Sequence, residues 1–174
     1  LFIISIAFSS NKSDALTYLN TIRTDAGLNT LQLNQNIETA AQNHADYLYS
    51  NNIVSHNETE NNSGFTGIDP SDRGFFAGYE TAAYYLENLS VGQKSITQSI
   101  DGLMSAIYHR FAFLNNNINE IGMGFDFTDS SRYVFNYNMG NSVLNNLCKG
   151  VSFTGHGTIY SSVCKDADFK IEES

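Results

Sequence analysis

Two histidines and a glutamate are the residues of this chain best placed to do chemistry. His109 lies just past an apolar row with helical spacing, formed by Ile96, Ile100, Leu103 and Ile107. A histidine at the end of a helix is held by a rigid element and can still reach a cavity, which suits a metal ligand or a proton carrier. The alternative is a structural histidine that hydrogen-bonds a carbonyl group. Ser55-His56 and Glu87-Asn88 also end predicted helical segments. Because three such polar groups recur at helix ends, we favour the interpretation of His109 as a metal ligand or proton carrier.

Other ionisable residues have simpler interpretations. Arg110 is expected to pair with a carboxylate or hold backbone carbonyls, although a guanidinium can also recognise an anionic ligand. His44 shares a helical face with apolar residues, which is typical of a core histidine. His156 lies in a glycine-containing loop, where solvent exposure is expected. Asp69 and Asp72 flank a proline as capping residues do, and no oxygen-rich calcium loop follows them.

The elements that must position these residues are helices first and a hairpin afterwards. Apolar periodicity and capping residues predict helices over 13–27, 34–52, 70–76 and 95–109, and alternation predicts strands over 121–127 and 133–139. Residues 79–89 fit a helix or a strand by pattern, and 157–163 fit a further strand. Helices followed by an antiparallel hairpin predict an α+β fold in which the helices pack against the sheet.

Composition excludes some classes of partner. The 174 residues, of which 41% are apolar and 16% charged, are enough for one globular domain. Nine basic and 18 acidic residues give a net charge of -9, and the sequence contains no cluster of lysine or arginine residues. Phosphate would be repelled by such a surface. We therefore expect no nucleic acid or anionic lipid surface as a partner, and we expect a monomer.

The start of the chain and its cysteines both point outside the cytoplasm. The first eight residues are apolar apart from Ser5 but are too few to span a bilayer, so 1–10 are interpreted as the remnant of a secretion signal, with a first strand as the alternative. Cys148 and Cys164 flank a glycine-containing loop that a disulfide would close in an oxidising compartment. We expect a secreted, periplasmic or cell-envelope protein with no integral membrane segment in the mature chain.

Several short motifs, in order, resemble the CAP superfamily of cysteine-rich secretory, antigen 5 and pathogenesis-related proteins, especially its bacterial secreted branch. The motifs are Leu19–Arg23 with Gly27-Leu28, Ala40–Ala45 with Ser55-His56, Glu87–Leu89 with Gly92, Ser105–Leu114 and Glu120–Gly124. The resemblance implies a CAP domain over 13–140, built as a three-layer α-β-α sandwich with a central antiparallel sheet. Residues 141–174 would then be a C-terminal extension that contains the disulfide loop.

The resemblance also implies a surface cleft with two histidines and acidic residues. Carried over, the histidine pair is His56 and His109, which could hold Zn²⁺ or another divalent metal, and Glu87 could orient or deprotonate a metal-bound water. Arg110 would be a further ligand-binding residue. A second family glutamate is missing, because its helix contains none, and Glu58 or Asp101 could take its place.

Two functions follow from this site. One is a secreted module that binds a cell-envelope, lipid or peptide ligand. The other is a metal-assisted hydrolase of a peptide or envelope polymer. A third interpretation makes the trio a buried hydrogen-bond network that holds the cleft walls together.

Overall fold

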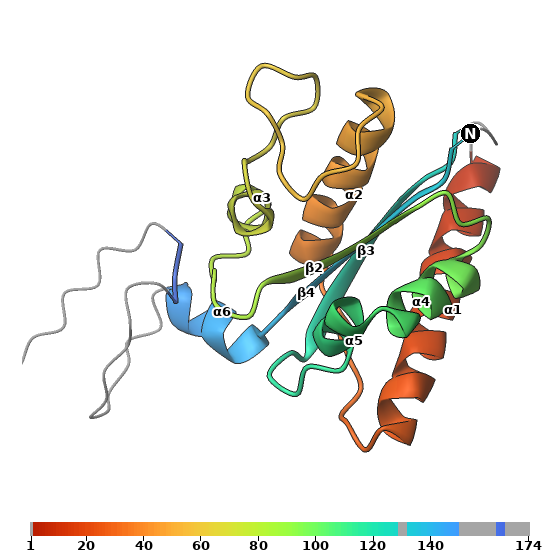
Figure 1. Ribbon diagram of the computed structural model, residues 1–174. Helices are drawn as coiled ribbons and strands as arrows, with labels where there is room; N and C mark the ends of the chain where they lie inside the picture. The colour runs from red at the N-terminus through yellow and green to blue at the C-terminus, as the bar shows by residue number, and fades with distance from the viewer. Residues whose placement is uncertain (1, 129–131, 150–162, 166–174) are drawn as a thin grey trace, which may run out of the picture.

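Helices and strands succeed one another along the part of the chain that the computed structural model describes, residues 2–128, 132–149 and 163–165 (Figure 1). In chain order they are α1 (Phe2–Asp25), β1 (Gln32–Leu33), α2 (Gln35–Ser50), α3 (Pro70–Phe76), β2 (Leu86–Val91), α4 (Ile96–Ser105), α5 (Ile107–Phe113), β3 (Glu120–Asp126), β4 (Val134–Gly140) and α6 (Ser142–Cys148). The predicted helices over 34–52 and 70–76 and the predicted hairpin are confirmed.

The strands form one sheet in the order β1-β3-β4-β2. β3 and β4 pair antiparallel from Glu120 opposite Gly140 to Asp126 opposite Val134. β2 pairs antiparallel with β4, and the short β1 pairs parallel with β3. The sheet is therefore mixed, with an antiparallel centre, and β2 forms one of its edges.

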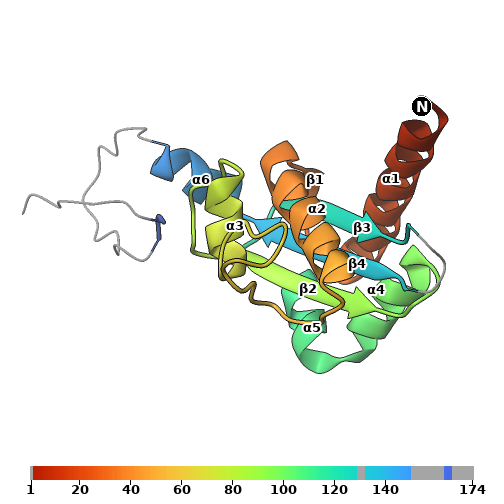
Figure 2. The ribbon, with the colours of Figure 1, turned by 90° about the horizontal axis from the view of Figure 1, so that it is seen from above.

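Helices cover both faces of this sheet, as the α-β-α prediction requires (Figures 1 and 2). Ile121, Met123 and Phe125 of β3 pack into one core with α1, α4 and α5. The intervening Gly122 and Gly124 face α2, whose backbone lies directly on them. A Cβ on Gly124 would lie 2.0 Å from the Ala41 oxygen. Large side chains thus point from β3 to one face of the sheet, and glycines without side chains lie on the other. Helix α2 therefore packs closer to the sheet than the helices on the opposite face do.

Helix α1 is longer than predicted. It begins at Phe2 instead of near Ser13, so the alternative of a first strand over 1–10 is wrong. The signal-remnant interpretation of these residues remains a prediction. Within the described residues, no helix combines the length and the apolar character needed to cross a bilayer.

The helix predicted over 95–109 is broken in two. Ala106 has an extended backbone, with φ -92° and ψ 120°, and separates α4 from α5. Ile107 therefore does not continue the apolar face of α4, because residues three or four apart share a face only within one continuous helix. Ile100 and Leu103 are buried, but Ile107 is 57% exposed and its predicted burial is wrong.

Glu87 and Asn88 belong to strand β2, which corrects their predicted place at a helix end. Of the stretch 79–89, which fitted a helix or a strand by pattern, only the part from Leu86 onward is strand, and none is helix. The disulfide between Cys148 and Cys164 is confirmed, with 5.4 Å between the two Cα atoms. Cys164 also forms a β-bridge with Thr81. His156 and the strand predicted over 157–163, apart from Val163, lie outside the described residues.

Candidate functional site

A cluster of ionisable side chains lies between the sheet and the loop that follows α2. We call His44, His56, Glu58, Arg73 and Glu87 the charged cluster. Four of these side chains are buried, and only that of His56, at 51% exposed, reaches solvent. Burying so many charges is costly unless they neutralise one another, so their contacts decide what the site can do.

Local sequence explains how α2 and α3 present two of these residues. The Asn34 side chain caps α2 by accepting from the Asn36 and Ile37 amides, and the apolar face of this helix carries His44 into the interior. Asp69 and Asp72 form a reciprocal capping box at the start of α3, as their capping role predicts. Arg73 follows directly and is fully buried.

Strand register determines the direction of Glu87. Its partner across the sheet is Asn138 of β4. Asn136, two residues earlier on the same face, donates to the carbonyl of Ala41 in α2. Because side chains alternate along a strand and paired residues share a face, Glu87 points toward the α2 layer.

Both oxygens of Glu87 are occupied by cationic or imidazole partners. Arg73 Nη2 donates to Oε2 at 2.8 Å, and His56 Nδ1 lies 2.8 Å from Oε1. Burial alone would raise the pKa of Glu87, but the hydrogen bond to His56 and the charge of Arg73 outweigh it and lower that pKa. The same hydrogen bond raises the pKa of His56. Glu87 is thus an ionised anchor for His56 and a poor proton acceptor.

Glu58 balances the other half of the cluster. Its Oε1 lies 2.8 Å from His44 Nδ1 and 3.7 Å from Arg73 Nε, and its Oε2 accepts from the Thr66 amide at 2.7 Å. His44 Nε2 lies 3.1 Å from the carbonyl of Ser55. Both neighbours of His44 are acceptors, so both contacts are full hydrogen bonds only in the imidazolium form.

His109 contacts the residue next to Glu87. Its Nδ1 lies 3.0 Å from Asn88 Oδ1, and Asn88 Nδ2 donates to the His109 carbonyl at 2.9 Å. Asn88 pairs with Tyr137, whose ring packs on Phe113 of α5, so it faces the α5 layer. His56 and His109 therefore bind neighbouring residues of the edge strand β2 from opposite layers.

The two histidines share a tautomer. Each Nδ1 faces an oxygen acceptor and must donate, which leaves Nε2 as the nitrogen with the free lone pair when the ring is neutral. This is the arrangement by which outer-shell groups hold metal-binding histidines. Arg110 instead donates through Nε to the Met104 carbonyl, as its structural interpretation predicts.

Whether the site could hold the expected Zn²⁺ depends on how many side chains are free to act as ligands. Nε2 of His56 and of His109 suits a metal, but Glu87 is already neutralised by Arg73. Among the described residues, no group of three or more His, Cys, Asp or Glu side chains is arranged to hold a metal ion. Catalytic zinc sites use three protein ligands. The residues present do not fit such a centre, and the metal role of His56 and His109 remains a prediction.

The sequence interpretation missed part of this site. His44 was assigned to the core and is buried, but it also joins the charged cluster. Arg73 was not singled out, because a buried arginine in a short helix carries no signal apart from the capping box before it. Glu58 lies in the cluster, as one of the two suggested substitutes, whereas Asp101 accepts from Tyr18 outside it.

Comparisons with known proteins agree with this architecture. A model of the cysteine-rich secretory protein family, CAP, matches residues 16–139. An outer surface protein of Borrelia burgdorferi has a TM-score of 0.67 and 18% identity, with 76% of this chain and 92% of that chain covered. An extracellular protein containing an SCP domain from Bacillus anthracis has a TM-score of 0.66 and 20% identity, with 76% and 41% covered.

A cysteine-rich secretory protein of Staphylococcus aureus is similar with a TM-score of 0.54 and 19% identity, with 76% and 39% covered. The chain thus spans about two fifths of the Bacillus and Staphylococcus proteins. All three structures are bacterial. No curated protein sequence matches this chain.

Proposed function

Because this chain belongs to the cysteine-rich secretory protein (CAP) family, we propose that it is an extracellular binding module for a lipid, peptide or cell-envelope ligand. The ligand lies over the edge of β2, between His56 and His109. The observation that carries the proposal is the exposed apolar side of α5, the helix whose other side places His109 against β2. The disulfide favours an oxidising, extracellular compartment.

The charged cluster supports binding more than catalysis. Both carboxylate oxygens of Glu87 are hydrogen-bonded, one to Arg73 and one to His56. Both oxygens of Glu58 are also hydrogen-bonded, one to His44 and one to Thr66. Carboxylates whose oxygens are all in contact with partners hold a scaffold in place, and the lowered pKa of Glu87 makes it a weak general base, since such a base needs a pKa near the working pH. The cluster thus acts as a neutralised support that aims His56 at solvent.

Helix α5 supplies an apolar surface. Ile107, Tyr108 and Phe111 are 57%, 83% and 61% exposed, and their spacing of one, three and four places them on one side of the helix. The break at Ala106 turns this side outward. Neighbouring exposed apolar residues mark interaction sites more often than isolated ones. A ligand with an apolar segment fits this side of α5, while His109 faces β2 from the other side of the same helix.

Fluorescence titration with 8-anilinonaphthalene-1-sulfonate tests the proposal, since this probe joins apolar rings to an acidic group. We expect saturable binding that the double variant Tyr108→Ser, Phe111→Ser weakens about fivefold or more, because it removes apolar contact area. Val143→Ser is the matched control, since Val143 is 70% exposed on α6. Equal binding by the double variant and the control, with native circular dichroism for both, would contradict the proposal.

A second candidate is hydrolysis. The observation that favours it is the pairing of Glu87 with His56 Nδ1, which leaves Nε2 able to accept a proton from water. Titration calorimetry with zinc, on the wild type, His56→Ala and His109→Ala, tests its metal-assisted form. Binding lost in both variants is the expected result for that form, and no binding by folded wild type argues against it.

A further inference from the structure

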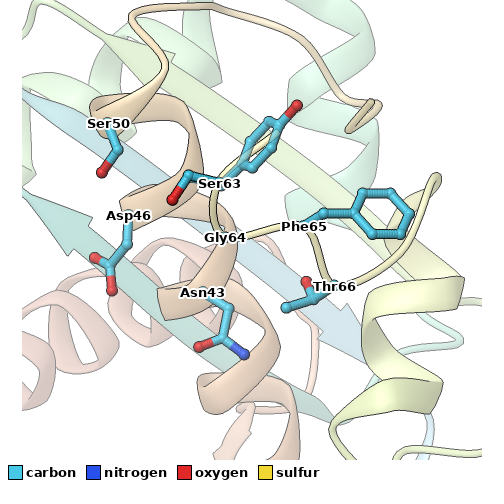
Figure 3. Close-up of a pocket in the computed structure, with 8 residues that line it drawn as sticks. Asn43, Asp46, Ser50, Ser63, Gly64, Phe65 and Thr66 are labelled. Carbon is cyan, nitrogen blue, oxygen red and sulfur yellow. The ribbon is translucent and has the colours of Figure 1, made fainter. Parts of the chain in front are cut away.

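A pocket of about 260 Å³ lies on the outer side of α2, away from the face that packs on the sheet. One wall is the helix, with Asn43, Asp46 and Ser50 at spacings of three and four, and the other is the loop over 63–66 (Figure 3). In Figure 3 these three side chains follow one another along the helix, with Ser50 nearest Ser63 and Asn43 nearest Thr66.

The loop wall is preformed. Asn62 Nδ2 and the Thr59 amide donate to the buried Tyr47 hydroxyl at 3.0 and 2.9 Å, and Asn51 Nδ2 donates to the Ser63 carbonyl at 2.9 Å. Thr66 is held by Glu58 of the charged cluster. These contacts fix both walls before any ligand arrives, which lowers the entropic cost of binding.

The polar lining has hydrogen-bonding capacity to spare. Asp46 accepts from Gln42 through Oδ1 only. Within the described part of the chain, the side chains of Asn43 and Ser50 take part in no hydrogen bond. Amide, carboxylate and hydroxyl groups side by side offer donors and acceptors to a ligand that has both.

Charge and size narrow the ligand class. The pocket is lined by one carboxylate and by no lysine or arginine, so a phosphate or carboxylate ligand would be repelled. Its volume lies just below the roughly 300–1,000 Å³ of drug-sized sites, which suits about one sugar ring. A second hollow of about 260 Å³ shares Asp46 with the first and is lined by Lys12, Gln42, Phe125 and Asp126 among others. Lys12 is paired with Glu38 at 3.1 Å.

We infer that this pocket is a binding site for a neutral carbohydrate, with one sugar ring between α2 and the 63–66 loop and a second ring extending past Asp46. Asp46 and Ser50 accept from or donate to ring hydroxyls, and Asn43 pairs with an amide or hydroxyl substituent. The site lies outside the β2 edge and does not depend on the function proposed above.

Nuclear magnetic resonance titration of the folded chain with N,N′-diacetylchitobiose tests the inference, with glucose 6-phosphate as the anionic comparator. We expect saturable amide shifts at 43–50 and 63–66 with the neutral disaccharide and much smaller ones with the phosphate. Asp46→Ala and Ser50→Ala should each weaken binding about fivefold, as expected for one lost hydrogen bond. Thr39→Ala is the matched control, because Thr39 is exposed on α2 outside the pocket.

Three results would overturn the inference. The first is no shift with the disaccharide, and the second is equal binding by Asp46→Ala and Thr39→Ala. The third is a set of shifts confined to α5 and β2, which would assign the sugar to the other site. Loss of the α5 response to 8-anilinonaphthalene-1-sulfonate would leave this inference untouched.

Discussion

Glu87 and His56 form the contact on which the exposed imidazole depends. The carboxylate is held by buried Arg73 and cannot turn away, so the Nδ1 contact at 2.8 Å fixes the ring. Arg73 could not be connected with Glu87 from the sequence, because one lies on a helix and the other on a strand, and Glu58 could be named only as one of two substitutes for a missing family glutamate. His56, Glu87 and His109 could be singled out because each motif keeps its order along the chain.

The sign of the pH dependence follows from these contacts. The pKa of Glu87 is lowered from 4.5, so its contribution to stability is complete above that value and is lost as the pH falls through the lowered pKa. The pKa of His56 is raised from 6.5, so its contribution is complete below that value and is lost as the pH rises through the raised pKa. Both contributions are complete between pH 4.5 and 6.5.

Replacing Glu87 by Gln tests the contact directly. We expect the pKa of His56, followed through its ring proton resonances, to fall in Glu87→Gln, because the hydrogen bond to the carboxylate is what raises it. His109→Gln serves as the control and should leave the His56 titration unchanged. An unaltered His56 pKa in a folded Glu87→Gln protein would show that the carboxylate does not hold the ring.

At the scale of elements, local signals predicted most of the fold. The caps of α2 and α3 and the alternation of β3 and β4 could be read from neighbouring residues. The break at Ala106 could not, because it depends on how α4 and α5 each pack and no proline or glycine stands there. The parallel pairing of the two-residue β1 is equally invisible, since it rests on a partner far along the chain.

Close contact between α2 and β3 gives a testable consequence. Gly124→Ala would place a Cβ 2.0 Å from the Ala41 oxygen, so either the helix or the strand must shift. We expect a loss of about 2–3 kcal/mol in the free energy of unfolding, measured by urea denaturation.

Gly102→Ala provides the matched control for this change. A Cβ there would come no closer than 3.9 Å, to Gln93, and the residue lies within α4. Alanine in an exposed helix should stabilise the protein by about 0.5–1 kcal/mol. Similar unfolding free energies for the two variants would contradict the close packing of α2 on β3.

At the scale of the whole molecule, one edge of the sheet gathers the features that point to a ligand. Helices lie on both sides of the sheet (Figure 2). His56 contacts Glu87 of β2 from one side, and His109 contacts Asn88 from the other. The break before α5 turns its apolar side to solvent at the same edge. The family resemblance predicted a cleft here, whereas the exposed side of α5 results from the break at Ala106, which no sequence signal marks.

Calorimetric titration of decanoate, in buffer with EDTA, tests the central claim most directly. Decanoate joins an apolar chain to a carboxylate and needs no metal. The account predicts saturable binding that both His109→Ala and the double variant Tyr108→Ser, Phe111→Ser weaken, while Val143→Ser binds as the wild type does. No binding by the folded wild type, or equal binding by all four proteins, would contradict a ligand site at this edge.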